Sequence, residues 1–379
     1  MSLSPLNVPI EIIVKEDTWP NADDPTRVCP TEIKALTTLG RATSVDSVLL
    51  WTAYCTRPPE SDGFSLADLW AWLRYRPALS DGPDLRLRPA WNRIDTHQKT
   101  ILSDDLGMGF AVELLATSLG FQDVADTVHV VKVTNPDDYA LGRTGKRGPS
   151  KSPDFLLTNV DGDVSVLECK GTQASREQLA SALKDGEVQK GNISRTGGAL
   201  FAHSLVAGLF IPQATKGELA LIQIHDPEPK DLMEILANTQ LTTLQLGILQ
   251  ISLAKQLSLL GLHSWANVLS TTPTRELDQV QFPRDLDAPV QLVEGSPHMT
   301  QIYYPPSLSA ARVPGPTSII FEMLLLEKIY ILLRESPSVS VALAQLSQFR
   351  GQRTWGFSQN GSRSRLESPL GFTLSLEYR

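Results

Sequence analysis

The sequence predicts an α/β fold in which a mixed central sheet is flanked by helices, with helical additions at the N- and C-terminal ends. Three observations lead to this class. Residues 96–228 alternate helical and strand patterns in the order helix, three strands, helix, two strands. Residues 1–95 mix short helical patterns with proline breaks, and residues 229–379 again carry apolar residues at helical spacing. We therefore expect an α/β core between two mainly helical regions.

The N-terminal region contains two stretches with helical patterns. Thr31–Tyr54 is predicted to be a helical pair, with Thr31 as its N-cap and Glu32 in the first turn. Ser65–Tyr75 is predicted to be a further helix, because its apolar residues recur at helical spacing. A turn-rich connection with several prolines leads from there to the core region.

The core region is expected to begin with a helix that Ser103 or Asp104 caps and that Gly120 ends. Valines alternate with other residues in Thr127–Thr134, which predicts a strand. The remaining core elements are a pair of strands joined by an Asp-Gly-Asp turn, a helix and two buried strands, expected at residues 153–160, 164–170, 174–190, 200–211 and 219–225.

The C-terminal region is expected to be mainly helical. Asp231–Asn238, Leu241–Leu262 and Thr317–Arg334 carry apolar residues at helical spacing. Residues 270–316 hold many prolines and are predicted to be an extended excursion or long loop. Near the end of the chain, Ser368–Tyr378 alternates enough to predict a short strand.

Composition limits the classes of function. The 379 residues include 34 Lys+Arg and 42 Asp+Glu, a net charge of −8, which argues against a passive nucleic-acid coat but allows an enzyme with a local basic groove. The three cysteines, Cys29, Cys55 and Cys169, lie far apart, so the sequence predicts neither a disulfide framework nor a structural zinc site. A reducing compartment is expected.

The sequence also suggests where the protein resides. The first residues lack a basic start followed by an apolar run, so no signal peptide is expected. Residues 196–215 carry no formal charge, but their three glycines, His203 and Pro212 suit a buried strand and its turns better than a membrane span. We expect a cytoplasmic protein that has no contact with a membrane.

Two carboxylates and a lysine are expected to meet at one end of the predicted strand pair. Side chains alternate along a strand, so Glu168 and Lys170 face the same way and Cys169 faces the opposite way. Asp154 opens the first strand of the pair and Glu168 closes the second, so an antiparallel hairpin brings them to the same end. Carboxylate oxygens suit Mg²⁺, which activates water and stabilises charge on a phosphate, and an ammonium group supports both effects.

A third carboxylate is expected near this pair. Glu113 is the lone charge in the middle of a helix that is apolar nearly all round, which implies that the helix is buried. A buried carboxylate is costly unless it is paired or bound to metal. We therefore expect Glu113 to face Asp154, Glu168 and Lys170.

The order Glu113 on a helix, Pro153-Asp154 at a strand start and Glu168-Cys169-Lys170 on the return strand resembles the PD-(D/E)xK nuclease superfamily. The resemblance covers residues 96–228, about a third of the chain. It implies a restriction-endonuclease-like core, with the same helix, strand hairpin and following helix. It also implies that the protein is an endonuclease or other nuclease that hydrolyses DNA, with RNA as the alternative substrate. The cofactor that it implies is Mg²⁺, for which Mn²⁺ can substitute.

The resemblance implies a role for each site residue. Asp154, Glu168 and the main-chain carbonyl of Cys169 would be metal ligands, and Lys170 would hold the attacking water. Glu113 would bind a second metal or orient the cluster. Some members carry a glutamine on the following helix, a role that fits Gln189, followed by Lys190, better than Gln178.

Basic residues near the predicted site are candidates for nucleic-acid binding. They lie before Asp154 and at the end of the following helix, at Arg143, Lys146, Arg147, Lys151 and Lys190. A second basic stretch contains Arg350, Arg353, Arg363 and Arg365. Either stretch also fits an ordinary solvated loop.

Other candidates favour structural roles. Cys169 faces the buried side of its strand, His97 and His225-Asp226 suit hydrogen bonding or capping, and Asp104 and Asp105 suit a helix N-terminus.

Two rival interpretations stay open. One is a non-catalytic module that binds a protein or nucleic acid, and the other is a structural subunit in which Glu113 pairs with Lys170. The large flanks and negative charge favour a protein partner or homo-oligomer, as in bacterial antiviral defence or restriction systems.

Overall fold

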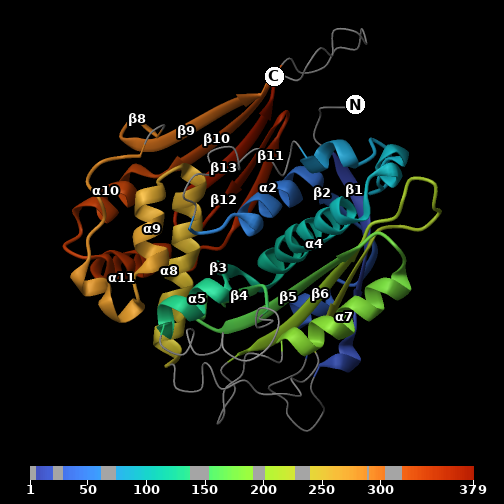
Figure 1. The fold of residues 1–379 in the computed structure, drawn as a ribbon, viewed down its shortest axis with the longest axis horizontal. Helices are drawn as coiled ribbons and strands as arrows, with labels where there is room; N and C mark the ends of the chain where they lie inside the picture. The colour runs from blue at the N-terminus through green and yellow to red at the C-terminus, as the bar shows by residue number, and fades with distance from the viewer. Residues whose placement is uncertain are drawn as a thin grey trace.

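The computed structural model describes residues 6–19, 29–60, 74–136, 153–190, 201–226, 240–287, 290–303 and 318–379. Figure 1 shows two sheets, with helices packed between them and on the outer face of the larger one. The larger sheet has seven strands in the order β2 (Thr38–Ser44), β1 (Asn7–Val14), β7 (Leu221–His225), β6 (His203–Phe210), β5 (Val164–Thr172), β4 (Phe155–Asn159) and β3 (Phe121–Asp126). The predicted mixed sheet flanked by helices is therefore confirmed.

Strand direction in this sheet is mixed. The pairs β1/β7 and β5/β6 are parallel, and the other neighbours are antiparallel. The helices associated with the sheet are α1 (Thr31–Lys34), α2 (Val45–Thr56), α4 (Thr96–Leu119), α5 (Thr127–Thr134) and α7 (Arg176–Lys190). α7 covers one face of β5 and β6, and α4, with α2 behind it, covers the other (Figure 1).

The N-terminal region was expected to be mainly helical. Its described part also contains two strands, β1 and β2, which extend the larger sheet. In β1, buried side chains alternate with less buried ones, and the strand pairs in parallel with β7, which lies about two hundred residues further along the chain. The predicted helical pair Thr31–Tyr54 is wrong in its middle, where β2 separates α1 from α2. Most of the predicted helix Ser65–Tyr75 lies outside the described residues.

Helix α4 begins earlier than the sequence predicted. Its N-cap is Asp95, whose side chain accepts a hydrogen bond of 3.1 Å from the main-chain N–H of Gln98. Ser103 and Asp104 are therefore interior residues of α4 and not its cap. The predicted end is confirmed, because Gly120 adopts a φ of 62° that other residues rarely adopt.

The predicted strand Thr127–Thr134 is helix α5, and the strand lies just before it, at β3. Packing overrides the β propensity of the valines here, since Val130, Val131 and Val133 are buried in the same apolar cluster as residues of α8 (Leu241–Leu260). The remaining predicted core elements are confirmed within a few residues as β4, β5, α7, β6 and β7.

The C-terminal region contains a six-stranded sheet as well as helices, and the expectation of a mainly helical region did not include this sheet. Beyond α8 its helices are α9 (His263–Thr271), α10 (Glu327–Glu335) and α11 (Val339–Arg350). An antiparallel sheet has the order β11 (Gly356–Asn360), β12 (Arg363–Glu367), β13 (Phe372–Tyr378), β10 (Ile319–Leu325), β9 (Ser296–Tyr303) and β8 (Gln291–Val293). Short 3₁₀ helices occur at Glu16–Thr18, Arg76–Ala78, Pro89–Arg93 and Thr274–Gln279.

Four C-terminal predictions have different outcomes. The predicted helix Thr317–Arg334 is wrong in its first half, which forms the central strand β10. Residues 270–316, expected to be an excursion, supply β8 and β9. The predicted strand Ser368–Tyr378 is confirmed as β13, whereas Asp231–Asn238 lies outside the described residues.

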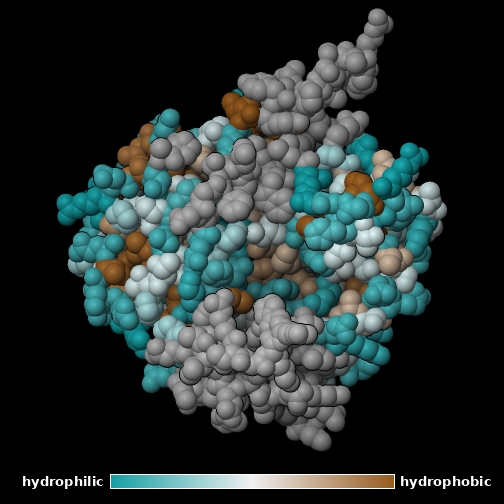
Figure 2. All heavy atoms as spheres, in the orientation of Figure 1, coloured by the Kyte–Doolittle hydropathy of each residue, from teal (hydrophilic) through white to brown (hydrophobic). Residues whose placement is uncertain are grey.

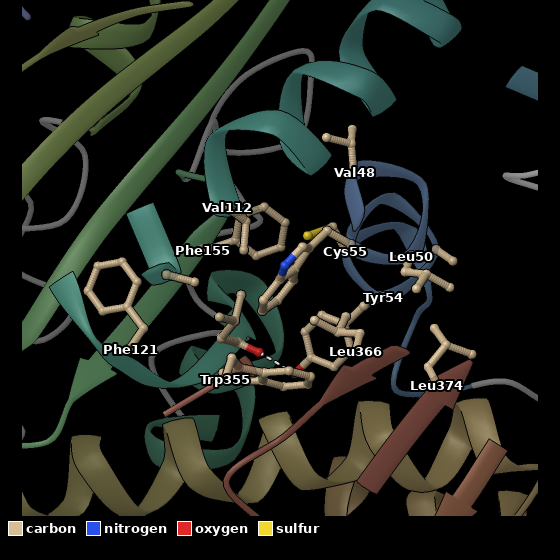
Figure 3. Packing of buried hydrophobic residues seen from close by; sticks show 14 of the residues in the cluster. Val48, Leu50, Tyr54, Cys55, Val112, Phe121, Phe155, Trp355, Leu366 and Leu374 are labelled. Atoms are coloured by element: carbon tan, nitrogen blue, oxygen red, sulfur yellow. Dashed lines mark hydrogen bonds between the residues drawn. The ribbon is translucent and has the colours of Figure 1, made fainter. Parts of the chain in front are cut away.

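An aromatic cluster fills the space between the two sheets (Figure 3). The ring of Trp355 lies 4.7 Å from that of Trp51 and 5.0 Å from that of Tyr54, measured between centroids. The Tyr54 hydroxyl donates a 2.8 Å hydrogen bond to the carbonyl of Val124 in β3. Large buried aromatic residues contribute strongly to stability, so α2 and the segment around Trp355 hold the two sheets together.

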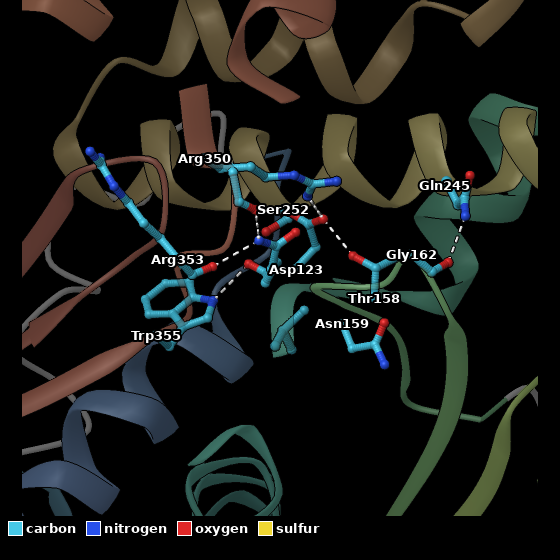
Figure 4. Close-up of polar contacts among 12 residues, drawn as sticks. Asp123, Thr158, Asn159, Gly162, Gln245, Ser252, Arg350, Arg353 and Trp355 are labelled. Atoms are coloured by element: carbon cyan, nitrogen blue, oxygen red, sulfur yellow. Dashed lines mark hydrogen bonds and ion pairs between the residues drawn. The ribbon is translucent and has the colours of Figure 1, made fainter. Parts of the chain in front are cut away.

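Polar contacts attach the segment after α11 to the edge strand β3 (Figure 4). Arg350 forms an ion pair with buried Asp123, which also accepts a 2.5 Å hydrogen bond from the Thr158 hydroxyl. The Gln122 amide donates to the carbonyls of Gly351 and Arg353 at 2.7 and 2.8 Å. Arg350 therefore has a structural partner and does not lie in the solvated loop that was one expectation for this basic stretch.

The face in Figure 2 is mostly hydrophilic, with small separate hydrophobic areas among its described residues. In the described part of the chain, no helix combines the length and the apolar character that crossing a membrane requires.

Candidate active site

The β4–β5 hairpin positions Asp154 beside Glu168, as the sequence predicted. Phe155 pairs with Leu167, which brings the residue before β4 next to the end of β5. One Asp154 carboxylate oxygen accepts a 2.7 Å hydrogen bond from the main-chain N–H of Cys169. The Asp154 carbonyl accepts another, of 3.1 Å, from Thr127 at the start of α5. These bonds fix Asp154 immediately before the start of β4, beside the part of β5 that extends beyond its pairing with β4.

Glu168 and Lys170 form an ion pair under helix α7. The Glu168 side chain is 2% exposed and that of Lys170 is 21% exposed. A methyl group at Gly186 of α7 would lie 3.2 Å from Cγ of Glu168 and 3.4 Å from Cε of Lys170, so the helix packs directly on both. Cys169 points to the opposite, apolar face, which confirms its predicted structural role.

Burial makes this carboxylate pair hard to ionise. Desolvation and the charge of Asp154 raise the pKa of Glu168 to about 8, although Lys170 opposes the shift. Desolvation also raises the pKa of Asp154 to about 6, against the hydrogen bond from Cys169 and the charge of Lys170. One oxygen of Glu168, Oε2, is buried without a hydrogen-bond partner. A further positive charge nearby would therefore stabilise the ionised form of the pair.

The structure does not bring Glu113 to this cluster. Burial raises the pKa of Glu113, and the charge that opposes this shift is Arg41 of β2. The face of α4 that contacts β5 passes through Ser103, whose carbonyl would lie 1.7 Å from a methyl group at Gly171. Glu113 is ten residues further on, and helix geometry turns it toward α2 and β2.

Asp104, and not Glu113, is the α4 carboxylate that interacts electrostatically with Lys170 and Asp154. It is exposed at the surface, and partial burial raises its pKa although the charge of Lys170 opposes the shift. Asp104 was misread because the helix start was placed too late. The signal that could have found it is the pair Ser103 and Gly107, small residues at a helix spacing that favours close packing on a strand.

Asp126 and Lys255 were also missed. The charge of Asp126, at the end of β3, raises the pKa of Asp154. Lys255 of α8 is fully buried, and its ammonium group lies 2.6 Å from Asp126 and 2.9 Å from the Cys55 carbonyl. Sequence alone offered a signal, since Lys255 is the only charged residue in the apolar stretch Leu241–Leu262.

The other predicted site residues are placed only in part. Arg143, Lys146, Arg147 and Lys151 lie outside the described residues. Gln189 and Lys190 end α7, one turn after Gly186, and their side chains lie outside the described part. Gln178 is in the first turn of α7, about 12 Å from Gly186 along the helix axis.

The predicted structural histidine and aspartate fit that role. His225 contacts the Gln223 amide at 2.6 Å, and Asp226 accepts a 3.0 Å hydrogen bond from the main-chain N–H of Ser204.

The oxygen ligands available for a metal are few. In the described ranges, no three His, Cys, Asp or Glu side chains are grouped closely enough to hold a metal ion. Asp154 and Glu168 still fit Mg²⁺, which binds through one or two carboxylates and keeps several waters. A bound cation would give the buried Oε2 of Glu168 a partner, and its charge would lower the raised pKa values of both carboxyl groups.

Raising the pH of the metal-free protein from 4.5 to about 8 is expected to lower its free energy of unfolding. The pKa of Glu168 is 4.5 in an unfolded chain and about 8 in the fold, so the folded state binds the proton more tightly. Its stabilising contribution is full below pH 4.5 and is lost as the pH rises through 8. Thermal unfolding in EDTA checks this, with Glu168→Gln expected to lose less stability over the same range; equal losses would contradict it.

Comparisons with protein-family models, with curated proteins and with solved structures found no match to this chain.

Proposed function

We propose that this protein is a metal-dependent nuclease that hydrolyses phosphodiester bonds of DNA. The observation that carries the proposal is the buried pair of Asp154 and Glu168 at the end of a strand hairpin, with Lys170 beside them. The helix, hairpin and following helix expected of a PD-(D/E)xK nuclease are all present in this order as α4, β4–β5 and α7. This likeness of elements supports a restriction-endonuclease-like core.

The site residues would divide the chemistry between them. Asp154, Glu168 and the main-chain carbonyl of Cys169 would hold Mg²⁺, which lowers the pKa of a bound water and stabilises negative charge on a phosphate. Lys170 would orient the attacking water and offset charge in the transition state. Gln189 would assist from α7, and Asp104 lies where it can orient the Lys170 ammonium group electrostatically. Glu113 has no part in this proposal.

Cleavage is expected to require Mg²⁺ or Mn²⁺ and to stop when EDTA is added, since the site offers oxygen ligands. Linear, circular and single-stranded DNA, and RNA, incubated with each metal would test this. Asp154→Asn and Glu168→Gln should abolish both cleavage and the binding of Mn²⁺ in a calorimetric titration. Undiminished cleavage in excess EDTA would refute the mechanism.

Replacing Arg143, Lys146 and Arg147 together with glutamine is expected to weaken DNA binding and to flatten its dependence on salt. These cations stand shortly before Asp154 in the chain, and fewer counterions are released when they are lost. DNA affinity measured over a series of salt concentrations checks this. An unchanged slope would assign these residues to another task.

The main rival is a module that keeps this fold without turnover. The absence of a third carboxylate close to the pair, among the residues that the structure describes, favours this rival. Against it, a binding module has no need of two buried acids whose pKa values are raised. Metal binding through Asp154 and Glu168 separates the two. We further propose a cytoplasmic setting with a protein partner or a second copy, as in bacterial defence or restriction systems.

A further inference from the structure

A polar groove of about 540 Å³ opens at the carboxyl ends of the parallel strands β5 and β6. One wall is the first half of α4, and the other consists of the segments that follow the two strands. Crevices at the carboxyl ends of parallel strands are common binding sites. The lining consists of hydroxyl groups, amides and two lysines, Lys99 and Lys216, and contains no carboxylate. In a chain of net charge −8, this is a locally cationic surface.

Both ammonium groups are oriented by the walls of the groove. Lys99 donates a 2.8 Å hydrogen bond to the carbonyl of Asn92, and Lys216 donates one of 2.7 Å to the carbonyl of Ala174. An ammonium group has three donors, so each lysine keeps donors for an anion. Glu177 interacts electrostatically with Lys216 but is not part of the lining. The preferred occupant is therefore an anion with several acceptor oxygens.

A chain of amides builds the floor. Gln173 donates to the Lys99 carbonyl at 2.7 Å and to the Ser103 hydroxyl at 3.0 Å, and accepts from Gln213 at 3.2 Å. The remaining acceptor, Oε1 of Gln213, is buried and has no partner. The floor thus ties the segments after β5 and β6 to α4, and so fixes the backbone from which Lys99 and Lys216 extend.

The groove lies next to the candidate active site along β5. Its β5 wall begins at Gly171, the residue after Lys170. At this point Ser103 of α4 approaches the strand so closely that only glycine fits. A nucleic-acid strand held at Asp154 and Glu168 therefore passes this groove within a few nucleotides.

We propose that the Lys99–Lys216 groove binds the sugar-phosphate backbone of the substrate strand beside the phosphate that is cut. This rests on the proposed function, and it names binding residues other than the basic residues at 143–151. A free phosphate or a mononucleotide offers the same phosphate chemistry, so the test includes both as competitors.

The test compares three proteins in EDTA, where the proposed chemistry is stopped. They are the parent, the double variant Lys99→Gln/Lys216→Gln, and a control, Lys15→Gln/Lys184→Gln, which removes the same charge from two exposed positions outside the groove. Fluorescence anisotropy with a labelled oligonucleotide gives the affinity at several salt concentrations. Circular dichroism and melting temperature confirm that all three are folded, and Mg²⁺ is then added to measure cleavage.

The double variant is expected to bind about tenfold more weakly at low salt, and its salt slope to fall by about 1.4 to 1.8, the value for two lost phosphate contacts. The control should keep the parent affinity, and mononucleotide or phosphate should compete only weakly. If the parent binds and cuts but the double variant matches the control, the groove proposal is overturned and the nuclease stands. If mononucleotide competes as well as the oligonucleotide, the groove is a small-molecule site. A parent that neither binds nor cuts overturns the proposed function itself.

Discussion

Replacing Lys170 with alanine is expected to lower the cleavage rate by about 100-fold or more, the effect of losing one electrostatic donor in an active site. Its ammonium group is paired with buried Glu168, and in the proposed mechanism it would orient the attacking water and offset charge on the phosphate. DNA affinity should change little, because one cation among several phosphate contacts contributes a small share. Cleavage rate, DNA affinity and melting temperature with Mg²⁺, measured on one preparation, check this.

The control for Lys170→Ala is Lys184→Ala, at an exposed position of helix α7, which covers the site. It should cut at the parent rate. Lys170→Ala also leaves Glu168 and Asp154 without a neighbouring cation, so some stability should be lost and regained with Mg²⁺. A Lys170→Ala protein that melts normally and cuts at the parent rate would make Glu168-Cys169-Lys170 a chance match. Loss of stability alone would favour a structural ion pair.

Replacing Lys255 with methionine is expected to lower the free energy of unfolding by about 3 kcal/mol, the cost of removing one partner of a buried ion pair. Methionine preserves much of the apolar packing, while Asp126 loses its 2.6 Å partner and the Cys55 carbonyl loses a donor. Urea unfolding of the parent and the variant measures the difference.

A double-mutant cycle identifies the cause of this loss. Adding Asp126→Asn to Lys255→Met removes the stranded charge and should restore part of the stability. The matched control is Lys132→Met, whose half-exposed ion pair with Glu60 should contribute less than 1 kcal/mol. Equal losses from Lys255→Met and Lys132→Met would contradict a buried electrostatic role.

The hairpin part of the site could be predicted from sequence because its determinants are local. The turn at 161–163, the alternation of Glu168 and Lys170 and the position of Asp154 follow from strand geometry over fewer than twenty residues. The geometry of these three residues therefore followed from sequence, while their chemistry stays a prediction.

The errors arose where distant segments decide the structure. β1 is a strand because β7 pairs with it, and Thr127–Thr134 is a helix because α8 covers its valines. Such partners are not visible in a local pattern. Glu113 was chosen over Asp104 because helix burial says which residues are inside but not which neighbour each one faces.

The buried Lys255 has a consequence for how the molecule can be divided. A fragment that ended at residue 228 would contain the whole hairpin and α7 but would lack α8. It would expose Tyr54 and Phe155, whose rings lie 5.2 and 5.5 Å from the Lys255 ammonium group, and would leave Asp126 uncompensated. The region that contains the candidate active site is thus not a portable module: it could not be grafted onto another protein, or have been gained by simple fusion, without the C-terminal region that completes its interior.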